Sequence, residues 1–258
     1  MKLDQVVNLK DHHINDLKFQ QSCKHQLDEQ GALSLTQFLS SEAIDMIIRE
    51  GNEKQQLAFY SQNSHNVYLK DSDPEFSIHH PRNKQIQSSK GCITDDQISA
   101  QSPLRTLYDS ECFRTFLASV FGLEELHNYA DPLSSINLHY ASEDQELGWH
   151  FDESSFAITL LIQAPEAGGT FEYIEDLRDA DKGEMNYEGV AEVFAGKRES
   201  KVLEADAGTL TLFRGRNALH RVTPVKGDTT RMLVVLAYNS LPNIGLSESA
   251  RMTFYGRL

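Results

Sequence analysis

The sequence predicts a mainly β protein with flanking helices, built as a double-stranded β-helix of the jelly-roll, cupin-like type. Two observations predict this fold class. Short apolar runs separated by Gly, Pro and Asp fill the chain from about residue 130 onward, which is typical of antiparallel strands joined by turns. Helix signals gather in the N-terminal half. We expect one domain over residues 1–258, with a helical or mixed support region (1–125), a jelly-roll core (126–240) and a C-terminal tail (241–258).

The N-terminal half shows one strand and two helical regions. Gly31–Phe38 alternates between apolar and polar residues, as a strand does. Ser40 is a good N-cap for the helix that follows, which we expect to end at Gly51. A second helical region begins at Pro103, is interrupted once and ends at Gly122.

The C-terminal half is expected to supply the strands of the core. In Ile136–Tyr140 the odd-numbered residue His139 faces away from Tyr140, and we interpret it as structural. The other runs cover residues 156–163, 170–174, 208–213, 219–225 and 231–238. Residues 176–207 are long, charged and partly helical around Tyr187–Ala195. Such an insertion is a candidate lid over a site, with a surface excursion as the equal alternative.

The bulk composition excludes several classes of partner. A net charge of −14 argues against nucleic acid and anionic membrane surfaces, because both attract clusters of Lys and Arg. No run approaches the ~18 apolar residues that a membrane-spanning helix requires. Cys23, Cys92 and Cys112 are odd in number and scattered, which indicates reduced thiols. We therefore expect a soluble, cytoplasmic protein, whose oligomeric state the sequence does not predict.

His150 and Asp152 are the first part of a candidate metal site. They are two residues apart on an expected strand, so both side chains point to the same face. His220 would complete a facial triad of two histidines and one carboxylate, which binds divalent first-row metals and leaves coordination positions open. A His-x-Asp triplet is weak evidence alone, but these ligands border apolar runs typical of buried strands.

Arg231 is a candidate anion-binding residue at the same site. If Gly227 and Asp228 form a two-residue hairpin loop, His220 pairs with Val235, and Arg231 faces the same side as His220. A three-residue loop would change this register. Arginine suits a dicarboxylate whose other end binds the metal, because the planar guanidinium meets a carboxylate in a bidentate way.

These residues resemble the Fe(II)/2-oxoglutarate-dependent dioxygenases. In this resemblance His150, Asp152 and His220 match the metal ligands. Arg231 stands in place of the arginine that holds the distal carboxylate of 2-oxoglutarate, and Tyr140 matches a tyrosine that often contacts 2-oxoglutarate in prolyl-hydroxylase-like members. The resemblance implies a jelly-roll enzyme that uses Fe(II), 2-oxoglutarate and dioxygen.

A narrower resemblance concerns the branch that acts on free amino acids, which contains lysine halogenases and their hydroxylase relatives. Ala130–Leu133, Leu147–Asp152 and Leu161–Pro165 are similar to that branch. The halogenase relatives have a small residue where this chain has Asp152, which vacates a metal position for chloride. We therefore expect hydroxylation and not chlorination.

The same resemblance suggests substrate contacts. Arg82 is a candidate partner of a substrate carboxylate, and a plain surface loop is the alternative. Trp149 and Asp131 are further candidates for substrate binding, with Asp131 as one of the acids able to receive an ammonium. Lysine-acting members place polar substrate contacts on the last strand, where this chain has Val235 and Ala237. A shorter or less polar side chain than that of lysine is therefore also compatible.

The sequence thus predicts an enzyme that hydroxylates an unactivated C–H bond of a small free amino acid, with lysine or an analogue as the first candidate. Two alternatives stay open. One is a hydroxylase of a protein or peptide residue, of the prolyl-hydroxylase-like type. The other is a non-catalytic jelly-roll module that binds or senses a metal.

Overall fold

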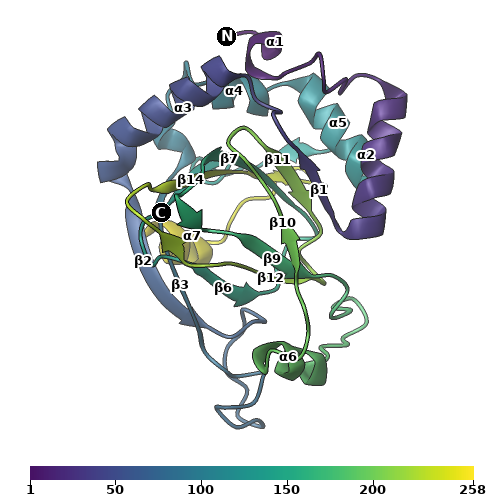
Figure 1. Cartoon of the computed structure of the whole chain (residues 1–258), viewed down its shortest axis with the longest axis vertical. Coiled ribbons are helices and arrows are strands. Elements are labelled where there is room, and N and C mark those ends of the chain that lie inside the picture. Colours follow the sequence, from purple (N-terminus) through teal and green to yellow (C-terminus); the bar gives the residue numbers. More distant parts are fainter.

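The computed structural model describes residues 1–258, and one eleven-stranded sheet that folds into two layers runs through it (Figure 1). Helices cover one face of this sheet, which confirms the predicted mainly β, jelly-roll fold class. The order is β1-β11-β7-β14-β5-β3-β6-β12-β9-β10, and β2 pairs with β3 outside this path. The strands are β1 (Ala32–Leu35), β2 (Phe59–His65), β3 (Ile86–Ile93), β5 (Ile136–Ala141), β6 (Leu147–His150), β7 (Ala157–Gln163), β9 (Phe171–Ile174), β10 (Lys201–Leu203), β11 (Leu210–Phe213), β12 (Leu219–Val222) and β14 (Arg231–Leu236).

Two short ladders complete the β structure. Ala167–Gly168 (β8) pairs with Val225–Lys226 (β13), and His127–Asn128 (β4) pairs with Tyr238–Asn239 (β15). Three strands of the large sheet, β1 to β3, come from the region before residue 125. The sheet therefore extends beyond the range expected for the core.

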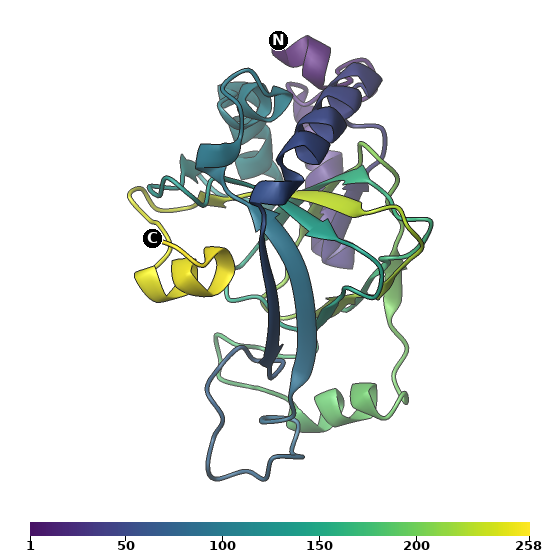
Figure 2. The same ribbon diagram turned by 90° about the vertical axis from the view of Figure 1, so that its left-hand side faces the viewer.

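The long strand β3 joins the two layers. Its C-terminal half pairs with β5, where Gly91 lies opposite Tyr140, and its residue Ser88 lies opposite Leu147 of β6. Figure 2 shows β2 and β3 running together down one side of the molecule, from the helices to the loop that follows β2. Because β3 belongs to both layers, its inward side chains span the space between the helix-covered layer and the layer of β6 and β12.

The helices form three groups (Figure 1). Five lie over the layer of β7, β11 and β14: α1 (Leu3–Val6), α2 (Leu17–Gln30), α3 (Ser41–Lys54), α4 (Pro103–Tyr108) and α5 (Glu111–Phe121). Together with that layer they bury the main apolar core, to which Phe113, Phe116, Leu138, Leu160 and Val234 belong. The helix α6 (Tyr187–Phe194) lies at the opposite end, and α7 (Glu248–Tyr255) packs on β2 and β3. None of these helices has the length and apolar character needed to cross a membrane.

The expected end of the third helix was wrong. Ser40 caps α3 as predicted, since its hydroxyl accepts from the Ala43 amide at 3.2 Å, but the helix continues past Gly51 to Lys54. A Cβ at Gly51 would lie 2.9 Å from the sulfur of Met232 and 3.1 Å from Leu138. Gly51 therefore serves the close approach of α3 to the sheet and not the end of the helix. By contrast, Gly122 does end α5, with a φ of 72°.

The predicted hairpin between the His220 strand and the Arg231 strand does not form. β12 pairs with β6 and β9, whereas β14 pairs with β5 and β7 in the other layer. Residues Val225–Lys226 pair with β8 instead, so the chain crosses between layers before Arg231 begins β14. The chain does turn near Gly227, as the sequence predicts. The strand that follows pairs in the other layer because the chain crosses between layers, and such a crossing is not encoded in the local sequence.

The insertion at 176–207 carries α6, which confirms the predicted helical part. It packs against the loop after β2: the Tyr68 hydroxyl donates to the Met185 carbonyl at 2.9 Å, and the Tyr187 ring meets Tyr68 edge-on at 5.5 Å. Phe151 stacks on Tyr68 at 5.5 Å and belongs to the same buried cluster as Leu177 and Val190. These two excursions from the sheet thus form one packed layer beside the strand that bears His150.

Candidate active site

Strand pairing brings the three predicted metal ligands together. His150 ends β6 and lies directly opposite His220 of β12, and Asp152 follows two residues after the end of β6. One oxygen of Asp152 lies 3.5 Å from Nε2 of His150 and 3.4 Å from Nε2 of His220. All three ligand atoms lie within 4.8 Å of one another. This is the arrangement of a facial triad.

The hydrogen bonds of the two imidazoles show that the site is built for a cation. Nδ1 of His150 donates to the Gly148 carbonyl at 2.9 Å, and Nδ1 of His220 donates to the Ala218 carbonyl at 3.0 Å. These bonds assign the proton of each neutral ring to Nδ1, so each Nε2 presents a lone pair. Two lone pairs then face the Asp152 carboxylate, an arrangement that a metal ion between them satisfies.

The electrostatics of the triad favour the forms that bind metals. Burial lowers the pKa of His150, and the neighbouring His220 lowers it further, which keeps the ring neutral. Burial by itself would raise the pKa of Asp152, but the two neighbouring histidines, which attract the carboxylate whenever one of them is protonated, outweigh burial and hold this pKa well below its usual range. The carboxylate is therefore ionised at neutral pH.

Asp152 is positioned by residues that the sequence analysis did not identify. Its amide donates to the Gly215 carbonyl at 3.1 Å, and its carbonyl accepts from Arg178 at 3.2 Å. Arg178 also donates to the Arg216 carbonyl at 2.8 Å and lies 4.2 Å from the centre of the Phe151 ring. A Cβ at Gly215 would overlap the Asp152 carboxylate. Gly215 leaves room for the third ligand, and Arg178 ties the segment after β9 to it.

The face of β5 and β14 that points away from the helices carries Arg231. On this face Arg231 lies beside Ala141, Leu233 beside His139 and Val235 beside Asn137. Nε of Arg231 is buried without a hydrogen-bond partner, no acidic side chain pairs with the guanidinium, and burial lowers its pKa to about 10. The group stays charged at neutral pH and has free donors, as the residue that holds a carboxylate must.

Tyr140 does not reach this face. Its side chain is fully buried under the helices, and its hydroxyl donates to the Gly51 carbonyl at 2.8 Å. Adjacent residues of a strand point to opposite faces, so it is His139 that points toward the interior. The expectation that Tyr140 contacts 2-oxoglutarate and that His139 points away from the site is corrected accordingly.

Two of the three predicted substrate residues also lie elsewhere. Trp149 alternates with His150 and therefore faces outward, where Arg221 covers its ring at 4.7 Å. Asp131 accepts from the amides of Leu133 and Leu246 at 2.8 and 3.2 Å, and its carboxylate lies 3.7 Å from Arg251. Its carboxylate thus anchors the C-terminal segment. Neither side chain is brought together with the triad.

Arg82 lies in the loop that packs on α6. One of its terminal nitrogens is buried without a hydrogen-bond partner. Burial raises the pKa of Tyr68, which stacks on Phe151, and the charge of Arg82 slightly opposes that rise. Arg82 is therefore on the side of the metal strand that the two excursions cover. It offers an unpartnered cation there.

Lys90 and His65 are further residues that the sequence analysis missed. Lys90, on the inward face of β3, donates to Nδ1 of His139 at 3.3 Å. The ring of His65, at the end of β2, lies edge-on to His150 at 6.2 Å and is held by Ser88 at 2.7 Å. No spacing rule relates β2 and β3 to a triad, so only the fold reveals these positions.

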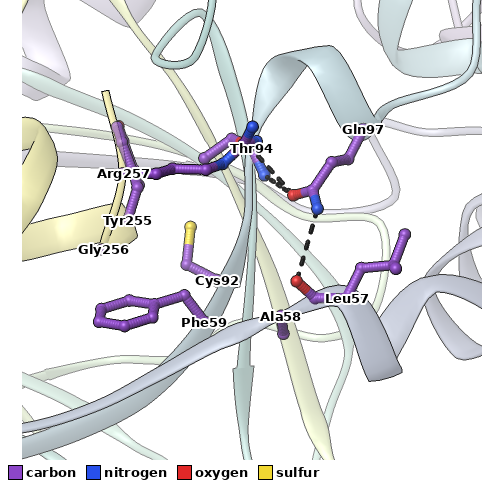
Figure 3. A pocket seen from close by; sticks show the side chains of 9 residues that line it. All are labelled: Leu57, Ala58, Phe59, Cys92, Thr94, Gln97, Tyr255, Gly256 and Arg257. Atoms are coloured by element: carbon purple, nitrogen blue, oxygen red, sulfur yellow. Dashed lines mark hydrogen bonds between the residues drawn. The ribbon is translucent and has the colours of Figure 1, made fainter.

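Two cavities lie along β3, and Cys92 and Tyr255 line both of them. A cavity of about 210 Å³ lies on the inward side between β3, β5, β14 and α7. A larger one of about 390 Å³ lies between the end of α7 and the start of β2 (Figure 3). There Arg257 binds Thr94, and Gln97 reaches the Leu57 carbonyl, so this cavity surrounds the attachment of the C-terminus. None of the three triad residues lines this cavity, and neither Lys90 nor Arg231 does.

Solved structures share this fold at low sequence identity. An oxidoreductase of the 2OG-Fe(II) oxygenase family from Burkholderia pseudomallei is 15% identical with a TM-score of 0.55, covering 88% of this chain and 93% of that chain. A prolyl hydroxylase from Trichoplax adhaerens, in complex with a peptide fragment of the oxygen degradation domain of hypoxia inducible factor, is 12% identical with a TM-score of 0.55, covering 86% and 90%. A prolyl-4-hydroxylase from Pseudomonas putida is 12% identical with a TM-score of 0.53, covering 85% and 98%.

The sequence comparison is more specific. None of the curated proteins compared with the sequence matches it. A protein family described as HalD, Halogenase D, matches residues 15–252. This match, the triad and the shared fold agree with the predicted Fe(II)/2-oxoglutarate oxygenase superfamily and with its expected cofactors, Fe(II), 2-oxoglutarate and dioxygen. Because the family match spans most of the length of this chain, the chain belongs to the Halogenase D family.

Proposed function

We propose that the protein hydroxylates an unactivated C–H bond of a small free amino acid. The observation that carries this proposal is the complete triad, in which Asp152 occupies the position of a metal ligand within 3.5 Å of both histidines. A carboxylate there leaves no vacancy for chloride, which halogenation requires. Hydroxylation is therefore the outcome that the donor set supports, although the family is described by halogenation.

The residues of the interior have distinct roles in this reaction. His150, Asp152 and His220 hold the metal, and Arg231 anchors the distal carboxylate of 2-oxoglutarate. With these bound, Fe(II), 2-oxoglutarate and dioxygen supply the oxidation, which couples decarboxylation to succinate with insertion of oxygen into a C–H bond. Leu233 and Val235, on the same face as Arg231, line the interior with groups that are hard to oxidise and that exclude water. The chain thus contributes binding, orientation and a dry site.

The size of the inward cavity beside α7 supports a small substrate. The inward cavity of about 210 Å³ is below the usual ~300–1,000 Å³ of pockets for drug-sized ligands. It is covered by α7, whose residues Phe254 and Tyr255 line it. A peptide substrate would instead need an open groove along the strand edge. Arg82, with its unpartnered nitrogen, is the candidate partner of the α-carboxylate.

The proposal is tested by a screen of free amino acids for substrate-stimulated succinate formation with Fe(II) and 2-oxoglutarate. Lysine, the candidate from the sequence resemblance, belongs in the panel beside acidic, neutral and other basic amino acids. At least one free amino acid should stimulate succinate formation and gain one oxygen atom. Arg82→Ala should weaken the binding of that amino acid while leaving the Kd of 2-oxoglutarate unchanged. Arg82→Lys should restore part of the lost affinity.

The peptide-hydroxylase alternative predicts a different result. If no free amino acid stimulates succinate formation while a peptide does, the small-substrate proposal is wrong. If neither stimulates it although Fe(II) and 2-oxoglutarate bind, a non-catalytic binding module becomes the better description. An unchanged response of Arg82→Ala to every substrate would remove only the role of Arg82.

A further inference from the structure

The inward cavity beside α7 offers hydrogen-bond donors but no acidic side chain. Lys90 and His139 are the lining side chains that can carry a positive charge, and the hydroxyl of Ser134 also lines the cavity. None of the other lining residues carries a charge at neutral pH. The lining residues are Lys90, Cys92, Tyr129, Ser134, Asn137, His139, Val235, Ala237, Leu246, Phe254 and Tyr255.

Lys90 lies between the metal site and α7. On β3 it shares a face with Ser88 and Cys92, each two residues away, or about 6–7 Å along the strand. Ser88 accepts from the Gly148 amide at 2.9 Å, beside the strand of His150. Cys92 belongs to the apolar cluster of Tyr255 on α7. The ammonium of Lys90 is thus placed where a substrate that extends from the metal toward α7 would pass.

The charge of Lys90 has no counter-ion in the protein. Its one hydrogen-bond partner is Nδ1 of His139, and no carboxylate forms an ion pair with it. Burial lowers the pKa of His139 well below its usual range, and the charges of Lys90 and Arg231 lower it further, so the ring is neutral. A neutral imidazole accepts a hydrogen bond from the ammonium but does not balance its charge.

The cofactors leave this charge unbalanced as well. The charges of Fe(II) and Arg231 are compensated by Asp152 and by the two carboxylates of 2-oxoglutarate. Lys90 remains as an extra cation in a desolvating site, and burial lowers its pKa despite the opposing influence of Cys92 and Asp152. An isolated buried cation is costly unless a ligand pairs with it.

We propose that Lys90 binds a side-chain carboxylate of the substrate, so that the enzyme acts on an acidic α-amino acid. This inference rests on the proposed function and narrows it. The α end of an amino acid carries an ammonium, and so does the side chain of lysine; in this cavity either would meet Lys90 and find no acid. Lys90 is then the specificity-determining residue, and its ammonium donates to the carboxylate.

The test uses glutamate and glutamine, which differ in the side-chain charge but share shape and α end. Their binding is titrated calorimetrically to the full chain loaded with Fe(II) and 2-oxoglutarate without dioxygen, with aspartate, asparagine and lysine as further ligands. The wild type should prefer one acid over its amide by at least about tenfold. Lys90→Met should abolish that preference, Lys90→Arg should retain part of it, and Lys90→Glu should turn it toward lysine. Lys226→Met, at the exposed position of β13, should leave all of these affinities unchanged.

Each contrary result has its own meaning. Tighter binding of lysine than of either acid to the wild type would overturn the proposal, as would an unchanged acid preference in Lys90→Met. If Lys90→Met weakens the binding of acid and amide equally, Lys90 contacts the α-carboxylate and the proposal is wrong. If Lys90→Met weakens the binding of 2-oxoglutarate, Lys90 belongs to the co-substrate site, which also overturns the proposal. Thermal unfolding of each variant shows whether it is folded. Turnover of a neutral or basic amino acid alone defeats this inference but leaves the proposed function standing, whereas no response to any amino acid defeats both.

Discussion

His150 and His220 are direct partners across β6 and β12, and their ring centres lie 4.1 Å apart. Each ring donates through Nδ1 to the carbonyl two residues before it, Gly148 or Ala218. The pairing of two strands therefore sets both the spacing and the tautomers of the two imidazoles. Only Asp152, which lies beyond the end of β6, needs further support from Gly215 and Arg178.

Removal of one imidazole should abolish metal binding without unfolding the chain. His150→Ala and His220→Ala each delete one of three ligands, and loss of even a supporting contact typically costs about 10–100-fold in metal affinity. We expect more than that loss, measured by anaerobic titration with Fe(II), together with a thermal transition close to that of the wild type. His25→Ala, at an exposed helix position, is the control. Wild-type Fe(II) affinity in either ligand variant would end the assignment of the triad.

Gly215→Ala should damage the site through sterics alone. The backbone of Gly215 is not in the left-handed region, so alanine is tolerated there, but its Cβ would overlap the Asp152 carboxylate. We expect a loss of about 10–100-fold in Fe(II) affinity, since the third ligand must move. The pairing of His150 with His220 should be unaffected. An Fe(II) affinity equal to that of the wild type would show that Asp152 has room to shift.

Arg231→Met should raise the Kd of 2-oxoglutarate by at least about tenfold, because a charge-assisted bidentate contact is lost. Arg231→Lys should recover part of the affinity, as lysine supplies the charge without the planar fork. Arg221→Met, on the outer face over Trp149, is the matched control and should bind 2-oxoglutarate normally. An unchanged Kd in Arg231→Met would place the anchor elsewhere.

The sequence predicted what depends on local patterns. The strand at Gly31–Phe38, most strands after residue 130, the capped helices and α6 follow from alternation and capping residues, whereas β2, β3 and β10 were not predicted. The pair of His150 and Asp152 follows from the two-residue period of a strand. His220 and Arg231 were identified from a motif of spaced residues. Arg231 does lie on the inward face of its strand, although the hairpin from which that position was predicted does not form.

What the sequence missed depends on which face of a strand points inward and on which strands become neighbours. Side chains on both faces of β5 can be buried. Alternation therefore places Tyr140 and His139 on opposite faces but does not predict which of the two faces the site. The inward face became clear only from the helices packed over Tyr140. Lys90 lies on a strand that joins two layers, and its approach to His139 is a contact between distant segments.

The cysteines should be unreactive in the folded protein. Burial raises the pKa of Cys23 to about 11 and that of Cys92 to about 12, and it also raises that of the half-buried Cys112. At a pH below its raised pKa each thiol stays protonated. Because the thiolate is the reactive form, these thiols then react slowly. At pH 8 we expect negligible reaction of Cys23 and Cys92 with a thiol reagent, and reaction of all three cysteines after denaturation. Rapid native labelling of Cys92, mapped by mass spectrometry, would show that the cavity beside α7 opens.

The product should be hydroxylated even when chloride is abundant. Chloride would need the metal position that Asp152 takes, and the backbone of Asp152 is held there by hydrogen bonds with the Gly215 carbonyl and the Arg178 side chain. With the substrate found in the amino-acid screen, turnover under ¹⁸O₂ in chloride buffer should yield a product that carries one labelled oxygen and no chlorine. Asp152→Asn, which keeps the size but weakens the ligand, should lower Fe(II) affinity and hydroxylation together. Chlorinated product from the wild type would mean that Asp152 leaves the metal during turnover, which its contacts in this structure oppose.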